Sequence, residues 1–171
     1  GPPLQQQFQK VFGVMEKEAR QMMNSYREYY GTKGMYENRV YEGVPRMLSR
    51  LQSAGIRILM ATSKPEKYAR MIAEHFGFTK YFEYIGGACM DGTRTMKYDV
   101  IEYVLDVCKV TDRERVVMVG DRCHDMIGAQ QAGLHRLGVL YGYGSQEELE
   151  QSGAESLAKT PQNVAEYILL T

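Results

Sequence analysis

One stretch of ten residues constrains the fold of this chain more than any other. An apolar run from Val116 to Val119 is followed by Gly120, and two carboxylates, Asp121 and Asp125, come directly after it. A short apolar run rich in valine predicts a buried strand of a parallel sheet. Ligands of open α/β sheets bind beyond the carboxyl ends of such strands. The stretch therefore predicts a parallel α/β sheet with two acidic side chains placed where a ligand would bind.

Asp121 and Asp125 are candidate metal ligands. Carboxylate oxygens suit a hard cation such as Mg²⁺, which takes oxygen ligands. The alternative is a solvated loop in which one aspartate caps the helix that follows. Both interpretations stay open on this stretch alone.

A second apolar run, at residues 57–61, ends in hydroxyl groups. Thr62, Ser63, Lys64 and Pro65 follow it, and Pro65 fits the first turn of a helix. The two hydroxyls and the backbone N–H groups of that helix start predict an anion site. The alternative is that Ser63 merely caps the helix.

Lys97 lies at the start of a helical pattern. The apolar positions of that pattern are Val100, Ile101, Val104, Leu105 and Cys108. The helix dipole slightly disfavours a cation at this end, so the position hints at a functional role. The alternative is an ordinary solvated lysine.

Strand and helix patterns alternate over most of the chain, which favours a parallel α/β sheet with helices on both faces. Strands are expected at residues 57–62, 82–85, 116–120 and 137–140. Helices are expected at residues 3–12, 14–30, 44–51, 68–76, 98–108, 122–132, 145–151 and 161–169. A glycine-rich loop, Tyr141–Ser145, follows the last of these strands; its backbone could approach a phosphate, or it could be a plain turn.

Composition narrows the class of protein. The 171 residues carry 21 basic and 21 acidic side chains, with no basic stripe of the kind that binds nucleic acid. No apolar run is long enough to cross a bilayer, and no signal-peptide pattern opens the sequence. The three cysteines, Cys89, Cys108 and Cys123, lack metal-type spacing, which favours a reduced, cytoplasmic protein. Cys123 is expected to be a packed side chain rather than a catalytic thiol.

The order strand–Thr62, then Lys97, then Gly120-Asp121-x-x-x-Asp125 resembles the haloacid dehalogenase superfamily of phosphohydrolases. Within it, the chain is most similar to the phosphoglycolate phosphatase-like group. Residues 1–4 resemble part of that group's helical cap, and residues 41–44 resemble the return from the cap to the core. The resemblance implies a Rossmann-like sheet, with a partial helical cap subdomain at residues 1–40 and an α/β core at residues 41–171.

The resemblance also implies an activity: Mg²⁺-dependent hydrolysis of a small-molecule phosphate monoester, similar to phosphoglycolate, through an aspartyl-phosphate. Thr62 would donate a hydrogen bond to a phosphoryl oxygen, and Lys97 would neutralise the attacking carboxylate and the phosphate. Asp121 would hold the metal, while Asp125 would bind it or orient its waters. Ser63 and Lys64 would contact the substrate.

The family's first motif, an apolar strand ending in Asp-x-Asp-Gly-Thr, is missing from these 171 residues. In the family its two aspartates are the nucleophile and the general acid/base, and its strand lies at the centre of the sheet. A similar run at residues 89–93 has Cys89 at the nucleophile position, follows a poor strand at residues 84–87, and is better interpreted as a turn at Asp91-Gly92. We therefore expect the strands before Thr62 and Asp121 to flank a gap, and these residues alone to be inactive and poorly stable.

Two other functions stay open. The chain could belong to a 5′-nucleotidase or a sugar-phosphate mutase of the same superfamily, because the motifs present here do not separate them. It could also be a non-catalytic relative that binds a phosphorylated metabolite. The sequence carries no signal for an oligomeric state.

Overall fold

The structure is a computed structural model that describes the backbone of residues 4–170 and the side chains of residues 8–170. Its contacts divide the chain into two compact units, Gly1–Arg39 and Val40–Thr171, which we describe separately. None of the helices described is long and apolar enough to cross a membrane.

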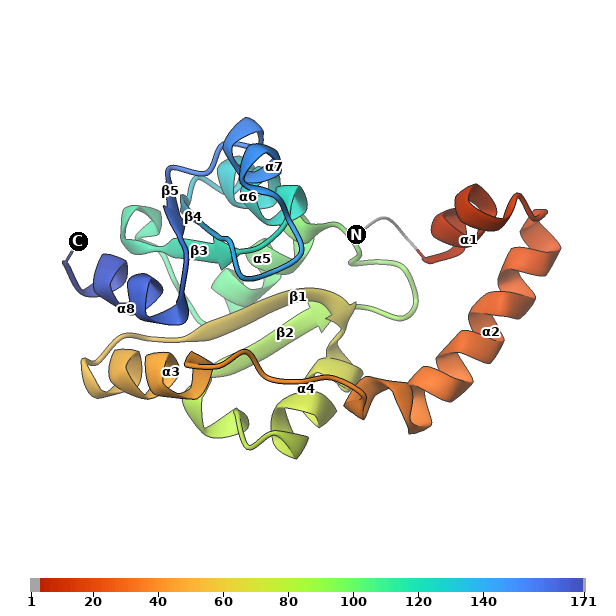
Figure 1. The fold of residues 1–171 in the computed structure, drawn as a ribbon, viewed down its shortest axis with the longest axis horizontal. Helices are drawn as coiled ribbons and strands as arrows, with labels where there is room; N and C mark the ends of the chain where they lie inside the picture. Colours follow the sequence, from red (N-terminus) through yellow and green to blue (C-terminus); the bar gives the residue numbers. More distant parts are fainter. Residues whose placement is uncertain (1–3, 171) are drawn as a thin grey trace. The chain divides into compact units, whose positions relative to one another are not determined.

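The first unit is helical. It contains α1 (Leu4–Phe12), α2 (Glu16–Thr32) and a short 3-10 helix, η1 (Gly34–Tyr36), drawn in red and orange in Figure 1. Aromatic rings hold α1 and α2 together. Phe8 meets Tyr26 edge-on with ring centroids 6.2 Å apart, and Tyr26 stacks on Tyr30 at 5.4 Å. Tyr26 thus packs between the two helices through its contact with Phe8.

The second unit alternates strands and helices in the predicted order. Its strands are β1 (Leu59–Pro65), β2 (Tyr84–Ala88), β3 (Val117–Gly120), β4 (His135–Val139) and β5 (Ser156–Ala158). Its helices are α3 (Val44–Ser53), α4 (Glu66–His75), α5 (Lys97–Val107), α6 (Cys123–Gln131), α7 (Gln146–Gln151) and α8 (Pro161–Leu170), with 3-10 turns η2 (Thr79–Tyr81) and η3 (Arg113–Arg115). This confirms the α/β class.

The strands form two separate parallel sheets rather than one. One sheet has the order β1-β2 and the other has the order β3-β4-β5. Among the strands described, none pairs with the second edge of β1 or of β3. The expected gap between the strands that precede Thr62 and Asp121 is therefore confirmed.

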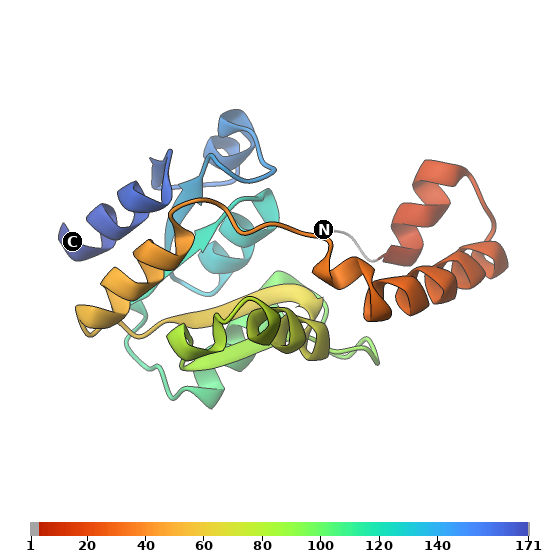
Figure 2. The same ribbon diagram turned by 60° about the horizontal axis from the view of Figure 1, so that its bottom comes forward.

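Helices cover both faces of each sheet, as Figures 1 and 2 show. On β2, Ile85 packs against Ala69 and Ala73 of α4, while a side chain at the next residue, Gly86, would overlap Val104 of α5. On the other sheet, α6 packs against β3 and β4, and α8 packs on the opposite side through Val164. The pair α5–α6 joins the two sheets, because α5 packs on β1 and β2 while α6 packs on β3 and β4; α3 packs against α8.

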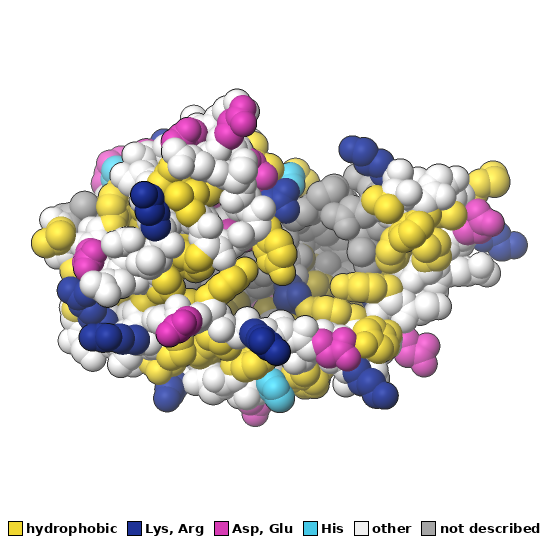
Figure 3. Space-filling model, viewed as in Figure 1, with side chains coloured by type: hydrophobic (Ala, Val, Ile, Leu, Met, Phe, Trp, Pro, Cys, Tyr) yellow, Lys and Arg dark blue, Asp and Glu magenta, His cyan; other side chains and the backbone are white. Residues whose placement is uncertain are grey.

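The two strands beside the gap, β1 and β3, are less buried than the strands they pair with, β2 and β4. Four of the five residues of β2 are buried, and so are the last three of β4. In contrast, every residue of β1 and the first three of β3 are only half-buried, although β3 is apolar. Figure 3 shows hydrophobic side chains open to view in the middle of this unit.

Two local predictions were wrong, and one short strand was not predicted. The segment at residues 84–87, expected to be a poor strand, is the buried strand β2. Glycine is suited to this strand because a side chain at Gly86 would overlap Val104 of α5. Pro65 is the last residue of β1 and the N-cap of α4 rather than a residue of the first helical turn, so Ser63 does not cap that helix. The three-residue strand β5 was not predicted at all.

Candidate functional site

Lys97 joins the two sheets. It is the first residue of α5, and its Nζ donates a hydrogen bond of 2.9 Å to the carbonyl oxygen of Ala61 in β1. The same Nζ lies 2.8 Å from Asp125 Oδ1, at the start of α6. Each side chain of this ion pair is only 11% exposed. Lys97 is therefore a nearly buried cation held between the β1–β2 and β3–β4–β5 sheets, not a solvated charge.

Asp125 uses both of its carboxylate oxygens inside the protein. Oδ1 pairs with Lys97, while Oδ2 accepts hydrogen bonds of 3.1 Å from the backbone N–H groups of Asp121 and Arg122. The helix-capping role that was the alternative for this loop is thus fulfilled by Asp125. Its carboxylate also fixes the position of the Lys97 ammonium group.

The glycine-rich loop after β4 wraps around Asp121. Tyr143 N donates a 2.8 Å hydrogen bond to Asp121 Oδ2, and Gly144 N donates one of 2.9 Å to the Asp121 carbonyl oxygen. A Cβ atom at Gly142 would overlap the Asp121 carboxylate, so only glycine fits there. The glycines of this loop therefore let its backbone approach a carboxylate and hold it in place.

Burial, together with the nearby charge of Asp121, raises the pKa of two tyrosines. Burial, followed by the nearby Asp121 and Tyr41, raises the pKa of Tyr141 to about 12. Burial, then Tyr143 and Asp121, also raises the pKa of Tyr41, whose ring meets that of Tyr141 edge-on at 5.5 Å.

Thr62 lies at the end of the regular pairing between β1 and β2. The register of the two strands shifts between Thr62 and Pro65, and Thr62 Oγ1 accepts a 3.2 Å hydrogen bond from Lys64 N. A hydroxyl that accepts one bond can still donate its own proton. Thr62, Ser63 and Lys64 are all half-buried at this end of β1, the end at which Lys97 binds Ala61.

The residues described here supply only part of the ligands that a metal ion needs. The part of the chain that the structure describes has no group of three or more His, Cys, Asp or Glu side chains able to hold a metal. Asp121 has one carboxylate oxygen beyond the one bonded to Tyr143 N, and this oxygen has the hard character that Mg²⁺ prefers. Asp121 thus fits as one ligand, and the remaining ligands would have to come from another segment.

A second acidic group clamps α7 onto the start of α6. Glu148 Oε1 accepts hydrogen bonds of 2.8 Å from Arg122 Nε and from Cys123 N, and these contacts lower the pKa of Glu148 to about 2. Burial raises the pKa of the Cys123 thiol, which argues against a catalytic thiolate. Burial lowers the pKa of His124, which favours its neutral form.

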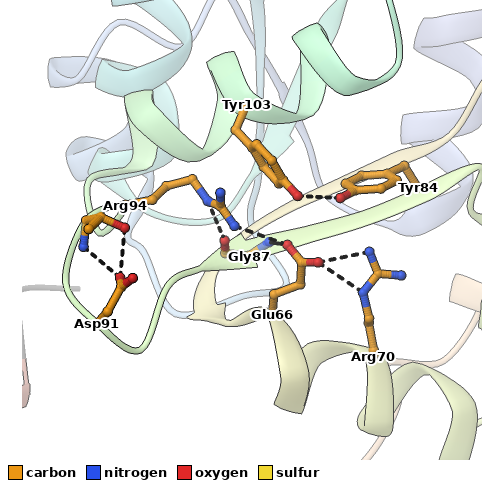
Figure 4. Close-up of polar contacts among 8 residues, drawn as sticks. Glu66, Arg70, Tyr84, Gly87, Asp91, Arg94 and Tyr103 are labelled. Carbon is orange, nitrogen blue, oxygen red and sulfur yellow. Dashed lines mark hydrogen bonds and ion pairs between the residues drawn. The ribbon is translucent and has the colours of Figure 1, made fainter.

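The sequence reasoning missed one polar cluster at the carboxyl end of β2. It is built around Glu66 and Arg94, which form an ion pair of 3.3 Å (Figure 4). Its two charged residues lie 28 positions apart, and no local pattern in the sequence links them. The Asp91-Gly92 segment beside it is a turn, as predicted: Asp91 Oδ1 accepts a bond from Thr93 N, and Gly92 has a φ of +87°.

Comparison with known proteins identifies the class. The family model of haloacid dehalogenase-like hydrolases matches residues 1–139, so the chain belongs to this family. Its relatives include a 5′-nucleotidase of Pseudomonas aeruginosa, 44% identical over 149 residues that make up 87% of this chain and 67% of the relative. A phosphoglycolate phosphatase of Vibrio parahaemolyticus is 26% identical over 84% of this chain and 63% of its own length.

Another relative is named as a kinase rather than as a phosphatase or nucleotidase. The tyrosine-protein kinase PtkA of Mycobacterium tuberculosis is 38% identical over 89% of this chain, which spans about half of that protein (51%). Among solved structures, a predicted phosphatase from Clostridium acetobutylicum has a TM-score of 0.92 and 37% identity, with 100% of this chain and 79% of that chain covered. A haloacid dehalogenase-like hydrolase from Streptococcus pneumoniae has a TM-score of 0.89, 27% identity, and coverage of 98% and 77%.

These findings place the chain among phosphoric monoester hydrolases by family resemblance. The expected Rossmann-like fold is confirmed by the solved structures.

Proposed function

We propose that these residues form most of a Mg²⁺-dependent phosphatase that hydrolyses a small phosphate monoester, and that a further strand fills the gap between β1 and β3. The observation that carries the proposal is Lys97, a nearly buried cation placed between the carboxyl ends of two incomplete sheets. Burying a charged side chain carries a large desolvation penalty, and charges buried despite this penalty are typical of functional sites.

The gap supports the proposed strand. All three described strand pairs are parallel, and the two edges that face the gap belong to the half-buried strands β1 and β3. Open, apolar strand edges pair readily with another strand. A parallel strand there would end beside Thr62, Lys97 and Asp121, where its last residues could supply the nucleophile and the general acid/base that the family uses. We call the protein with this strand the strand-completed form.

The residues at the site suit phosphoryl transfer, which depends mainly on positioning and charge neutralisation. Lys97 would neutralise the attacking carboxylate and the phosphate, and Thr62 would donate a hydrogen bond to a phosphoryl oxygen. Ser63 and Lys64, on the same segment, would contact the substrate. Asp125 acts through Lys97, because its oxygens are already engaged.

Asp121 would hold Mg²⁺ together with carboxylates of the added strand. The ion would polarise the phosphoryl group and neutralise its charge. The backbone of the Tyr141–Gly144 loop keeps one oxygen of Asp121 occupied and so directs the other towards the ion.

A nucleoside 5′-monophosphate is the substrate that a specific observation favours over a phosphoglycolate-like compound. The Tyr143 side chain is 85% exposed although its backbone binds Asp121, and nearby Tyr41 is 46% exposed. Exposed aromatic rings beside a phosphate site can stack on a nucleobase. The name of the 44% identical relative, 5′-nucleotidase, agrees with this choice.

The experiment is to measure phosphate release by the strand-completed form from nucleoside 5′-monophosphates, phosphoglycolate and sugar phosphates, with Mg²⁺ or with EDTA. We expect Mg²⁺-dependent release, fastest for nucleotides. The variant Tyr143→Ala, which keeps the backbone N–H, should lower kcat/KM for nucleotides about 10-fold and leave phosphoglycolate unaffected. Tyr143→Phe is the matched control and should behave as the wild type.

Three other outcomes of this experiment would contradict parts of the proposal. Transfer to an added sugar acceptor instead of water would indicate a mutase. Binding of phosphorylated metabolites without turnover would indicate a non-catalytic protein. Equal turnover with EDTA would contradict the metal dependence. The proposed partner in every case is a small phosphorylated metabolite, and a cytoplasmic location stays a prediction.

A further inference from the structure

The side chain of Arg94 is held on three sides (Figure 4). Its Nε donates a 2.9 Å hydrogen bond to the carbonyl oxygen of Gly87, and its Nη2 lies 3.3 Å from Glu66 Oε2. Its guanidinium carbon lies 3.5 Å from the centroid of the Tyr103 ring in α5. The side chain is only 19% exposed. A planar cation that is stacked, bonded and shielded in this way is an ordered structural element rather than a surface charge.

Glu66 connects this arginine to the end of β1. It is the first residue of α4, directly after Pro65, and its Oε2 also accepts a 3.3 Å hydrogen bond from Gly87 N. Its Oε1 binds Arg70 Nη2 at 3.0 Å on the solvent side of α4. Glu66 and Arg94 therefore bind the N–H and the carbonyl of the same residue, Gly87.

The end of β2 lies very close to the segment that follows Thr62. A Cβ atom at Gly87 would lie 2.5 Å from the Lys64 carbonyl oxygen and 2.8 Å from Glu66 N, so a side chain there has no room. The pair of Glu66 and Arg94 thus closes around the point where β2 meets the proposed substrate-binding segment.

Arg94 also anchors the loop that leads to Lys97. The loop between β2 and α5 is folded on itself by a hydrogen bond of 2.8 Å from Cys89 N to the Arg94 carbonyl oxygen and by the Asp91 turn. The Arg94 side chain then ties this loop to β2 and α4, three residues before Lys97. The position of the first turn of α5 consequently depends on this anchor.

We infer that Arg94 is a positioning residue, which, with Glu66, fixes the β2–α5 loop so that the Lys97 ammonium group stays between Ala61 and Asp125. Its effect on catalysis rests on the proposed function, but its effect on Lys97 does not. Arg70 offers a matched control, because it binds the same glutamate and is 46% exposed, and its other contact is with the Tyr84 ring of β2, 5.0 Å from its guanidinium carbon.

The first test compares Arg94→Ala and Arg70→Ala in the strand-completed form by NMR and amide hydrogen exchange. The side-chain signals of Lys97, assigned with a Lys97→Arg variant, should shift in Arg94→Ala only. Amides of residues 88–97 should exchange at least about 10-fold faster in Arg94→Ala, while those of β4 stay unchanged. Unchanged Lys97 signals in Arg94→Ala, or equal shifts in both variants, would overturn the inference.

The second test is kinetic. Arg94→Ala should lower kcat about 10- to 100-fold with KM changed less than about 2-fold, because Lys97 is displaced while the substrate contacts remain. Arg70→Ala should stay near the wild type. If Arg94→Ala does not fold, Glu66→Gln takes its place and should shift the Lys97 signals in the same direction. Absence of turnover in the wild type would contradict the proposed function, and the Lys97 signals would still decide the role of Arg94.

Discussion

The strands beside the gap differ from the strands they pair with in burial and in the residues at their carboxyl ends. β2 and β4 are largely buried and end in small or apolar residues, whereas β1 and β3 are half-buried and lead into Thr62 and Asp121. The strands that lead into the polar groups are thus the two that face the gap, each paired on one edge only. This difference suggests that the missing pairing and the missing chemistry have one cause, since one strand would supply both.

The largest expected effect comes from Asp121→Asn in the strand-completed form. Loss of the proposed anionic metal ligand should reduce Mg²⁺-dependent kcat by at least about 10³-fold. Tyr143 N can still bond to the amide oxygen, so the loop should keep its fold. Asp106→Asn, at an exposed position of α5, is the control and should be fully active. Near-normal turnover of Asp121→Asn would refute the site.

Lys97→Ala tests the link between the two sheets. It should abolish turnover and lower the free energy of unfolding by about 3–5 kcal/mol, because Asp125 would be left as an uncompensated, nearly buried charge. Urea unfolding and phosphate release measure the two effects. Lys67→Ala, at an exposed position of α4, should change neither. A Lys97→Ala protein as stable as the wild type would show that the ion pair is not the link described here.

Gly142→Ala tests the loop that holds Asp121. A methyl group there overlaps the Asp121 carboxylate, so the loop or the carboxylate must move. We expect kcat to fall about 10- to 100-fold, since small displacements of a catalytic group have effects of this size. Unchanged kcat and unchanged Mg²⁺ dependence in Gly142→Ala would contradict the role of the loop.

A pair of core substitutions compares a gap-facing strand with a buried one. Leu137→Ala in β4 should lower the free energy of unfolding by about 2–5 kcal/mol, because Leu137 is 1% exposed. Val119→Ala in half-buried β3 should lower it by about 1 kcal/mol or less in residues 1–171 alone. In the strand-completed form the effect of Val119→Ala should grow as the new strand covers it. An equal effect in both forms would mean that no strand packs there.

The smallest expected effect concerns pH and Glu148. Its pKa falls from an ordinary 4.5 to about 2 in the folded protein, so its contribution to stability is present above about pH 4.5 and is lost as the pH falls towards 2. The free energy of unfolding should therefore decline more steeply in this window for the wild type than for Glu148→Gln. Parallel pH profiles would show that the contacts of Glu148 with Arg122 and Cys123 contribute nothing.

Much of the fold was predictable because its signals are local. The apolar runs before Thr62 and Gly120 and the helical pattern after Lys97 all gave elements within a few residues of the observed ones. The exception, β2, was misjudged because two glycines in a strand look unfavourable until the packing of α5 against them is known. The strand β5 is too short to leave a periodic pattern.

The residues of the candidate site could be predicted from the sequence, but the contacts between them could not. The motifs singled out Lys97, Asp121 and Asp125, yet only the structure shows that Asp125 binds Lys97 and that the Tyr143 backbone binds Asp121. Such contacts join residues 22 or more positions apart, and no local pattern reports them. The pair of Glu66 and Arg94 was missed for the same reason.

The most direct test of the account is Mg²⁺-dependent phosphate release from a nucleoside 5′-monophosphate, measured for residues 1–171 alone and for the strand-completed form. We expect no turnover by residues 1–171, because Lys97 and Asp121 face a gap without a nucleophile, and clear turnover once the strand is present. Mg²⁺-dependent turnover by residues 1–171 alone would contradict it, since the nucleophile would then have to lie among the residues described here.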